Sequence, residues 1–311
     1  MSKKIISHLL NYAASEGAKD LVLESGTNCL ISHYHFPDGT KKSFALPKKL
    51  EKNLILNLRE LLKVAPGELT TKKYCKIFDD HYQSSFYLTI IPDKNGEKII
   101  INLINKASKH WSLRQLGLLK DDYKSLSAGL KEHSGLIIVS SPPQHGKSST
   151  LYSLLEQLNN EKKNVYVLSE HPTERIDGLN QLLLSENNFN KILRQDPDVI
   201  ALDEITNAEI LKKSIQAAES GCLVIATIEA ENVLEVISKI LNLDLPLKLK
   251  LDSLKMILNQ HLVDLKRPKK LAGRGRNKIG VFELLVFDQT IKDWLFKNSL
   301  KNLKSKLKQK S

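Results

Sequence analysis

A short segment after an apolar run combines residue types that bind phosphate groups. Residues 135–150, GLIIVSSPPQHGKSST, place Gly146-Lys147-Ser148 between a predicted buried strand and a helical pattern. At the start of a helix, free backbone N–H groups and the helix dipole favour an anion. Lys147 can reach the β- and γ-phosphates of a nucleotide, and the Ser148 hydroxyl can bind Mg²⁺. The segment predicts a nucleotide-binding loop made of Ser141, Pro142, Pro143, Gln144, His145, Gly146, Lys147, Ser148 and Ser149.

The loop departs from the full phosphate-loop pattern, G-x-x-x-x-G-K-[ST]. Ser141 stands where the first glycine is usual, and Gln144 and His145 are bulky where small residues are common. An ordinary loop with a chance Gly-Lys-Ser is therefore an alternative interpretation. The apolar run before the loop and the helical pattern after it favour nucleotide binding, because the mechanism needs a strand and a helix there.

An acidic pair follows a second apolar run. In DPDVIALDE, residues 196–204, four apolar residues end in Asp203-Glu204. At the end of a buried strand, the Asp203 carboxylate can hold Mg²⁺ and the Glu204 carboxylate can activate the attacking water. The alternative is a strand that ends in a solvated acidic turn. The phosphate loop upstream favours the functional interpretation.

Two further strand-like runs end in polar residues. In VYVLSEHPTE (165–174), Glu170 follows the run and would lie beside the phosphate loop if the two strands are neighbours; an acidic turn residue is the alternative. SGCLVIATIEAEN (220–232) brings Thr227 and Glu229 to the same sheet edge. Thr227 is a candidate sensor of the γ-phosphate, and an ordinary β-branched strand residue is an equally good interpretation.

The region from Gly135 onward alternates strand and helix patterns, which predicts a mainly parallel sheet with ligands at the carboxyl ends of its strands. The predicted strands are 135–140, 164–169, 198–202, 222–228 and 278–288. The predicted helices are 147–160, 188–194, 207–219, 231–242 and 248–264, and residues 291–311 predict a basic amphipathic helix that frays into a lysine tail.

The first part of the chain predicts a small α+β unit with an antiparallel sheet. Its predicted helices are 3–16 and 48–63, and its predicted strands are 18–25, 29–36, 74–78, 85–92 and 97–104. The predicted domains are an N-terminal α+β domain (1–105), a linker with a lead-in helix (106–134) and a P-loop domain (135–311). The predicted fold class is therefore α/β.

Composition limits the function classes. The chain has 311 residues, of which 41% are hydrophobic and 26% charged, and three cysteines. No apolar run approaches the ~20 residues of a membrane helix, and the N-terminus is a poor signal peptide, so a cytoplasmic protein is expected. The net charge is +12. Dispersed lysines with few interleaved aromatic residues favour a solvated surface over a nucleic-acid site.

Several segments together resemble the ATPases of type II secretion and type IV pilus assembly, the secretion ATPase superfamily. They are LRQDPDVIALDEITNAE, SEHPTE, GCLVIATIEAEN and QHLVD…IGVFELL; AKDLVLE, PDG and IIPDKNGEKIIINLI resemble the family's N-terminal sheet domain, which is similar to a PAS fold. The resemblance implies a RecA-like second half, ATP and Mg²⁺ as cofactors, and a homo- or hetero-hexameric ring. It also implies inner-membrane platform and pilus or secretion components as partners, at the cytoplasmic face of the inner membrane.

The chain departs from this family's pattern at several positions. The loop reads SPPQHGKSS where the family has GPTGSGKST, and no four-cysteine zinc motif is present, so no zinc is implied. Family arginines, histidines and acidic residues are replaced at Tyr87, Asn102, His171, Cys222 and Glu229. A guanidinium is worth much to phosphoryl transfer, and tyrosine or asparagine cannot replace it. These changes argue for weak hydrolysis, whereas Lys147, Ser148, Glu170 and Asp203-Glu204 argue for binding of nucleotide and Mg²⁺.

Three hypotheses follow. The first is a divergent P-loop ATPase that powers or supports pilus assembly or protein secretion. The second is a catalytically weakened or inactive structural subunit of a mixed motor ring. The third, which ranks lowest, is a basic P-loop protein that binds nucleic acid.

Overall fold

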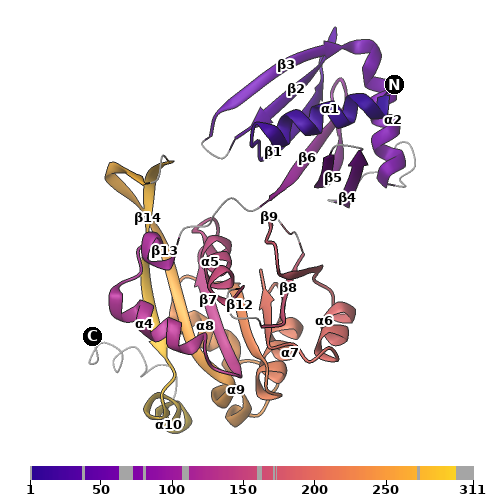
Figure 1. Cartoon of the computed structure of the whole chain (residues 1–311). Coiled ribbons are helices and arrows are strands. Elements are labelled where there is room, and N and C mark those ends of the chain that lie inside the picture. The colour runs from indigo at the N-terminus through magenta and orange to yellow at the C-terminus, as the bar shows by residue number, and fades with distance from the viewer. Residues whose placement is uncertain are drawn as a thin grey trace. The chain divides into compact units, whose positions relative to one another are not determined.

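The computed structural model describes residues 2–36, 39–62, 73–79, 82–106, 112–159, 163–170, 172, 174–271 and 274–298. The chain forms two compact units, Met1–Ser108 with His171–Ile176, and Lys109–Glu170 with Asp177–Ser311 (Figure 1). The first unit is α+β with a mainly antiparallel sheet, and the second is α/β with a mainly parallel sheet. The predicted fold class is confirmed.

The first unit packs two helices against one sheet. Its elements are α1 (Ser2–Ser15), β1 (Asp20–Ser25), β2 (Cys29–His35), β3 (Lys41–Pro47), η1 (Lys48–Leu50), α2 (Glu51–Leu62), β4 (Lys73–Asp79), β5 (Tyr82–Asp93) and β6 (Gly96–Lys106). The strands lie in the order β3-β2-β1-β6-β5-β4, and β9 (Glu174–Arg175) pairs with β6. Buried sheet residues such as Leu21 of β1 and Leu30 of β2 form a core with Leu10 of α1 and Leu54 of α2.

Strand β3 is absent from the sequence-based prediction. Six of its seven positions are exposed and the remaining one is half-exposed, so KKSFALP shows no buried apolar face of its own. Its antiparallel pairing with β2, from Cys29↔Pro47 to His35↔Lys41, makes it a strand. Pairing with a neighbour thus decides this edge strand, and local pattern does not.

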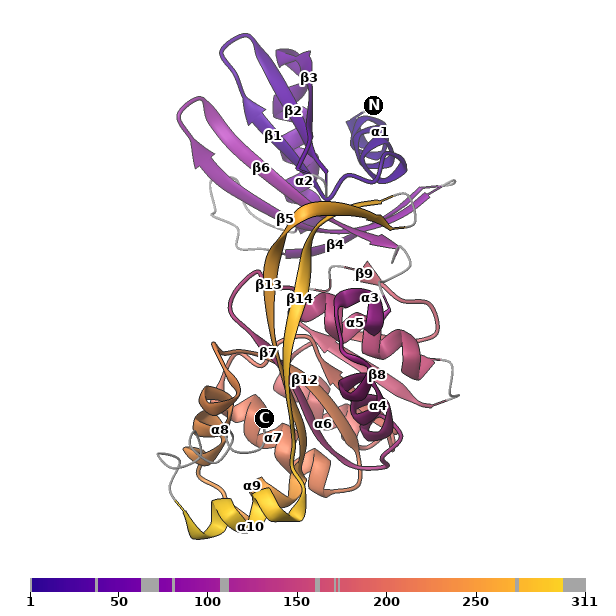
Figure 2. The ribbon, with the colours of Figure 1, turned by 90° about the vertical axis from the view of Figure 1, so that its left-hand side faces the viewer.

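The second unit holds one sheet between two layers of helices. Its elements are α3 (Leu113–Leu116), α4 (Lys120–Gly129), β7 (Gly135–Ser141), α5 (Lys147–Asn159), β8 (Val165–Ser169), β10 (Asn180–Leu183), α6 (Glu186–Leu193), β11 (Val199–Leu202), α7 (Ala208–Glu219), β12 (Leu223–Glu229), α8 (Val233–Leu241), α9 (Leu247–Ser253), β13 (Leu254–Leu271), β14 (Arg274–Val286) and α10 (Gln289–Lys297). The strand order is β10-β8-β11-β12-β7-β13-β14. All neighbours are parallel except β13 and β14, which run side by side as a long antiparallel ribbon (Figure 2).

Central strands β7 and β11 are buried along their whole length, because helices cover both faces of the sheet. Helices α4 and α5 lie on one face, and α7, α8 and α9 lie on the other (Figure 2). The core on the second face joins Ile138, Ile200 and Val224 of the sheet to Ile215 of α7 and Ile237 of α8. This double cover leaves the carboxyl ends of the strands as the edge where a site can form.

The predicted helix over 248–264 is wrong. Helix α9 ends at Ser253, and β13 begins at Leu254. The segment LKMILNQHLVD carries enough apolar residues to satisfy a helical spacing. Parallel pairing with β7 and antiparallel pairing with β14 stabilise the extended form instead. A helix is present in the predicted C-terminal region, where α10 runs from Gln289 to Lys297; residues 299–311 lie outside the described part. None of the described helices is long and apolar enough to span a membrane.

The assignment of β13 to the buried sheet leads to a stability prediction. Ile257 is fully buried, whereas Val263, farther along the same strand, is 42% exposed. Ile257→Ala should lower the free energy of unfolding by about 2–5 kcal/mol, because it leaves a cavity in the core. Val263→Ala should change it by less than about 1 kcal/mol. Chemical denaturation of both variants measures the difference, and equal losses would contradict the placement of β13.

Candidate functional site

The phosphate-loop candidate connects the buried strand β7 to the first turn of α5, as the sequence predicts. Gly146 has a φ of +86°, and a Cβ added there would lie 2.9 Å from the Gln260 Nε2 atom. Positive φ and close approach therefore both require glycine at this position. Gln144 also takes a positive φ, of 61°, which is uncommon for a residue with a side chain.

Strand β13 holds this loop from the side. The Gln260 side chain is buried, with 1% of its surface exposed. Its Nε2 donates to the main-chain carbonyl of His145 at 2.6 Å, and its Oε1 accepts from the Thr150 hydroxyl. The main-chain N–H of Leu262 donates to His145 Nδ1 at 3.0 Å. These bonds tie both sides of Gly146-Lys147-Ser148 to β13.

Sequence reasoning missed Gln260, because it placed residues 248–264 in a helix. A helix would have separated Gln260 from the loop, whereas β13 lies directly beside β7. The segment QHLVD was singled out only as a family resemblance. No local pattern pairs Gln260 with Thr150, 110 residues earlier in the chain.

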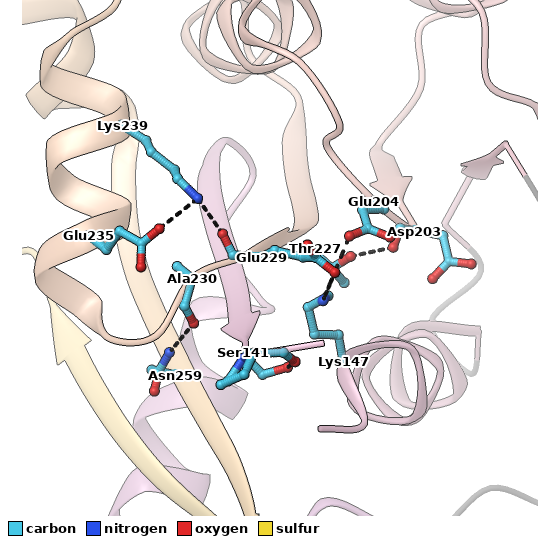
Figure 3. Close-up of polar contacts among 11 residues, drawn as sticks. Ser141, Lys147, Asp203, Glu204, Thr227, Glu229, Ala230, Glu235, Lys239 and Asn259 are labelled. Carbon is cyan, nitrogen blue, oxygen red and sulfur yellow. Dashed lines mark hydrogen bonds and ion pairs between the residues drawn. The ribbon is translucent and has the colours of Figure 1, made fainter. Parts of the chain in front are cut away.

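The structure brings the loop lysine close to Glu204, the second residue of the acidic pair. Lys147 is the first residue of α5 and is 9% exposed. Its Nζ lies 3.7 Å from Glu204 Oε1 and 3.5 Å from Glu229 Oε1 (Figure 3). Strand β12 separates β11 from β7, so Glu229 at the end of β12 lies between the other two ends. The edge therefore holds one buried ammonium group with two carboxylates beside it.

Asp203 is held in place by three elements. It is 8% exposed, and its Oδ2 accepts from Ser169 Oγ at 3.1 Å and from Tyr152 OH at 3.3 Å. The Thr227 hydroxyl, which is buried, donates to the main-chain carbonyl of Asp203. Tyr152 and Ser169 were not predicted as site residues. Ser169 precedes the candidate Glu170, and this adjacency is the one clue in the sequence.

Glu170 lies elsewhere than the sequence suggests. Strands β11 and β12 separate β8 from β7, so β8 is not a neighbour of the phosphate-loop strand. Glu170 is exposed, and its Oε1 accepts from Thr206 Oγ1 at 2.9 Å. Thr206 follows β11 and the acidic pair. The structure thus places Glu170 beside the loop after Asp203-Glu204.

The remaining loop residues differ in exposure. Ser141 and Pro142 are buried, and Ser141 Oγ donates to the Pro142 carbonyl at 2.8 Å. Pro143 and Ser149 are exposed, and Ser148 is half-buried. A cavity of about 550 Å³ is lined in part by Glu204, Glu229, Asn207 and Lys239.

The environment of Glu204 raises the pKa of its carboxyl group above the usual value. Partial burial is the main cause, and the carboxylates of Glu229 and Asp203 add to it, while Lys147 acts in the opposite direction. Ionisation of Glu204 is therefore less favourable in the folded protein than it is in water. A group in this state is suited to accept a proton.

A family model described as "Type II/IV secretion system protein" matches residues 4–306. This chain belongs to that family. The family resemblance found in the sequence is confirmed. The match covers both units, including the sheet edge around Lys147.

Named relatives agree with this assignment. "Type II secretion system ATPase E" of Vibrio cholerae is 25% identical over 269 residues, which are 84% of this chain and 54% of that protein. "Protein transport protein HofB homolog" of Haemophilus influenzae is 27% identical over 319 residues, which cover 95% of this chain and 68% of that protein. The chain thus spans about half the length of the first of these relatives.

Solved structures show the same fold. The pilus retraction motor PilT with bound ADP matches with a TM-score of 0.74 at 20% identity, over 97% of this chain and 89% of PilT. The Legionella pneumophila ATPase DotB matches with a TM-score of 0.69 at 16% identity, over 98% of this chain and 86% of DotB. At these identities the likeness concerns the fold alone.

The contacts of Gln260 predict a role in stability. Gln260→Ala should lower the free energy of unfolding by about 1–3 kcal/mol, because it removes buried partners of Thr150 and His145. Gln216→Ala makes the same chemical change at an exposed position of α7 and serves as the control. Urea denaturation of the secretion-family protein and both variants measures the effect, and equal stability of the two variants would contradict it.

The raised pKa of Glu204 predicts that its replacement by a neutral residue stabilises the protein in a pH-dependent way. Above the folded-state pKa the ionised group carries its full cost, and below the unfolded value of about 4.3 both states are protonated and the cost vanishes. Glu204→Gln should therefore raise the melting temperature at pH 7, and the gain should fade towards pH 4. Glu231→Gln, at an exposed position, controls for the loss of one negative charge. A gain that grows on acidification would disprove this explanation.

Proposed function

We propose that this chain binds ATP with Mg²⁺ and hydrolyses it to power or support pilus assembly or protein secretion. The observation that carries the proposal is the ion pair between Lys147, at the first turn of α5, and Glu204, the second residue of the acidic pair that follows β11. A lysine at a helix start beside an acidic pair is the arrangement that phosphoryl transfer requires. Membership of the secretion family supports the same proposal.

The residues of the site fit this nucleotide and cation. Nine-tenths of the Lys147 side chain is buried at the N-terminus of a 13-residue helix, where anions are favoured. The Ser148 hydroxyl and the Asp203 carboxylate are oxygen ligands of the kind that Mg²⁺ prefers. We assign phosphate binding to residues 141–149 and Mg²⁺ binding to Ser148 and Asp203. When bound, Mg²⁺ neutralises charge on the phosphate oxygens.

Each side chain then has a defined task. Lys147 binds the β- and γ-phosphates, and Gln260 holds the loop around them through His145 and Thr150. Glu204 takes a proton from the attacking water, a task that its raised pKa favours. Glu170 is a second candidate for orienting that water, and Thr227 for sensing the γ-phosphate. Thr227 acts on the site through its bond to the main chain of Asp203.

We infer that the working form is a ring, with one kind of subunit or with two, and a hexamer is the state implied by the family resemblance. Its partners would be inner-membrane platform, pilus or secretion components, and its place the cytoplasmic face of the inner membrane. No specific nucleic-acid partner is proposed. One observation favours the second hypothesis, a weakened subunit of a mixed ring. Lys147 already lies near two carboxylates, which compete with phosphate.

Replacement of Lys147 tests the proposed function. Lys147→Ala should reduce ATP turnover by more than about 100-fold, because it removes a buried cation from the phosphate site. Lys131→Ala, at an exposed position, should leave turnover unchanged. ADP release and equilibrium ATP binding are measured on the same preparations. Binding without turnover would favour the weakened subunit, and neither binding nor turnover would refute the proposal.

A further inference from the structure

Glu229 takes no part in the proposed reaction, although it contacts the central lysine. We propose that Glu229 is a built-in competitor of the nucleotide, a carboxylate that occupies Lys147 and thereby lowers the affinity of the loop for phosphate. This inference rests on the proposed function of the loop. It goes beyond that function because it identifies the residue that sets how tightly the nucleotide is held.

The geometry around Lys147 supports this assignment. The Nζ atom is 3.5 Å from Glu229 Oε1 and 3.7 Å from Glu204 Oε1, and the lysine is only 9% exposed (Figure 3). A poorly hydrated ammonium group interacts strongly with nearby charges. The Glu229 side chain is 53% exposed, so little is lost when it swings away into water. Glu229 is thus a partner that a phosphate group can displace.

The main chain keeps Glu229 close to the loop. Glu229 pairs with Ser141 across β12 and β7, and the next residue, Ala230, donates its N–H to the Ser141 carbonyl at 3.2 Å. Asn259 Nδ2 donates to the Ala230 carbonyl at 3.3 Å, and Lys239 Nζ donates to the main-chain carbonyl of Glu229. The carboxylate can therefore leave Lys147, but its Cα stays at the edge of the phosphate loop.

The negative charges around Lys147 weaken the binding of a nucleotide that carries no Mg²⁺. The carboxylates of Glu204 and Glu229 lie beside the ammonium group of Lys147, and the Asp203 carboxylate acts electrostatically on Glu204. Lys239, which lines the cavity, has its Nζ atom 2.9 Å from Glu235 Oε1. To bind Lys147, a polyphosphate must displace the Glu229 carboxylate, and it must also approach the negative charge of that carboxylate. The penalty grows with the negative charge of the ligand and falls with ionic strength.

The test compares ATP binding by Glu229→Gln, by Glu231→Gln and by the unchanged protein. Glutamine has the same shape as glutamate and carries no charge. Glu231 is exposed two residues along the chain, and within the described residues no ion pair joins it to Lys147. Titration calorimetry is run with excess EDTA and again with excess Mg²⁺, and melting temperatures confirm that each variant is folded.

Glu229→Gln should bind ATP roughly tenfold more tightly, which corresponds to about 1.4 kcal/mol. The gain should be larger in EDTA than in Mg²⁺, because the free nucleotide carries more negative charge, and it should shrink at high salt. Glu231→Gln should show little of this gain.

Equal affinities of the unchanged protein and Glu229→Gln, weaker binding by Glu229→Gln, or the same gain in both variants would overturn the inference and leave the proposed function standing. If none of the three proteins binds ATP under any condition, the inference and the proposed function both fail.

Discussion

The buried positive charge of Lys147 is the constraint on which the site depends. A lysine with 9% of its surface exposed is stable only where negative groups compensate for its lost hydration. Here carboxylate oxygens of Glu204 and Glu229 lie within 4 Å of the Lys147 Nζ atom. Glu229 ends β12, which pairs with β7, and Glu204 follows β11, which pairs with β12. Three strand ends from separate parts of the sequence must therefore stay in register. The double layer of helices, which buries β7 and β11 completely, maintains that register.

The same charge balance connects binding with catalysis. Partial burial and the neighbouring carboxylates raise the pKa of Glu204, and Lys147 opposes them. A ligand that draws Lys147 away would remove this opposing effect and leave Glu204 with a stronger tendency to hold a proton. Asp203 differs, since Ser169 and Tyr152 both donate to its Oδ2. Two adjacent carboxylates thus experience different surroundings, which is a usual way to assign them different tasks.

Strand β13 links the core of the sheet to the loop. Its first half pairs with β7, and its Gln260 and Leu262 bond to His145 and Thr150 on either side of Gly146. The loop lacks the first glycine of the usual pattern and carries the bulky Gln144 and His145. His145 in this chain is a structural part of the loop, because its ring nitrogen and its carbonyl oxygen each accept a hydrogen bond from β13.

Local patterns in the sequence determined much of this protein. Gly146-Lys147-Ser148 after an apolar run, the Asp203-Glu204 pair after another, and the alternation of strand and helix predicted the α/β unit and its site edge, because the physics that selects these residues acts within a few positions. Only the tertiary structure decided the strand order that moves Glu170 away from the loop, the extended form of β13, and the contacts of Gln260 and Glu229. The side-chain hydrogen bonds of Glu229 and Gln260 join residues that are 82 to 115 positions apart in the chain. The apolar pattern of 254–264 fits a helix and a strand alike, so only pairing with β7 and β14 distinguishes them.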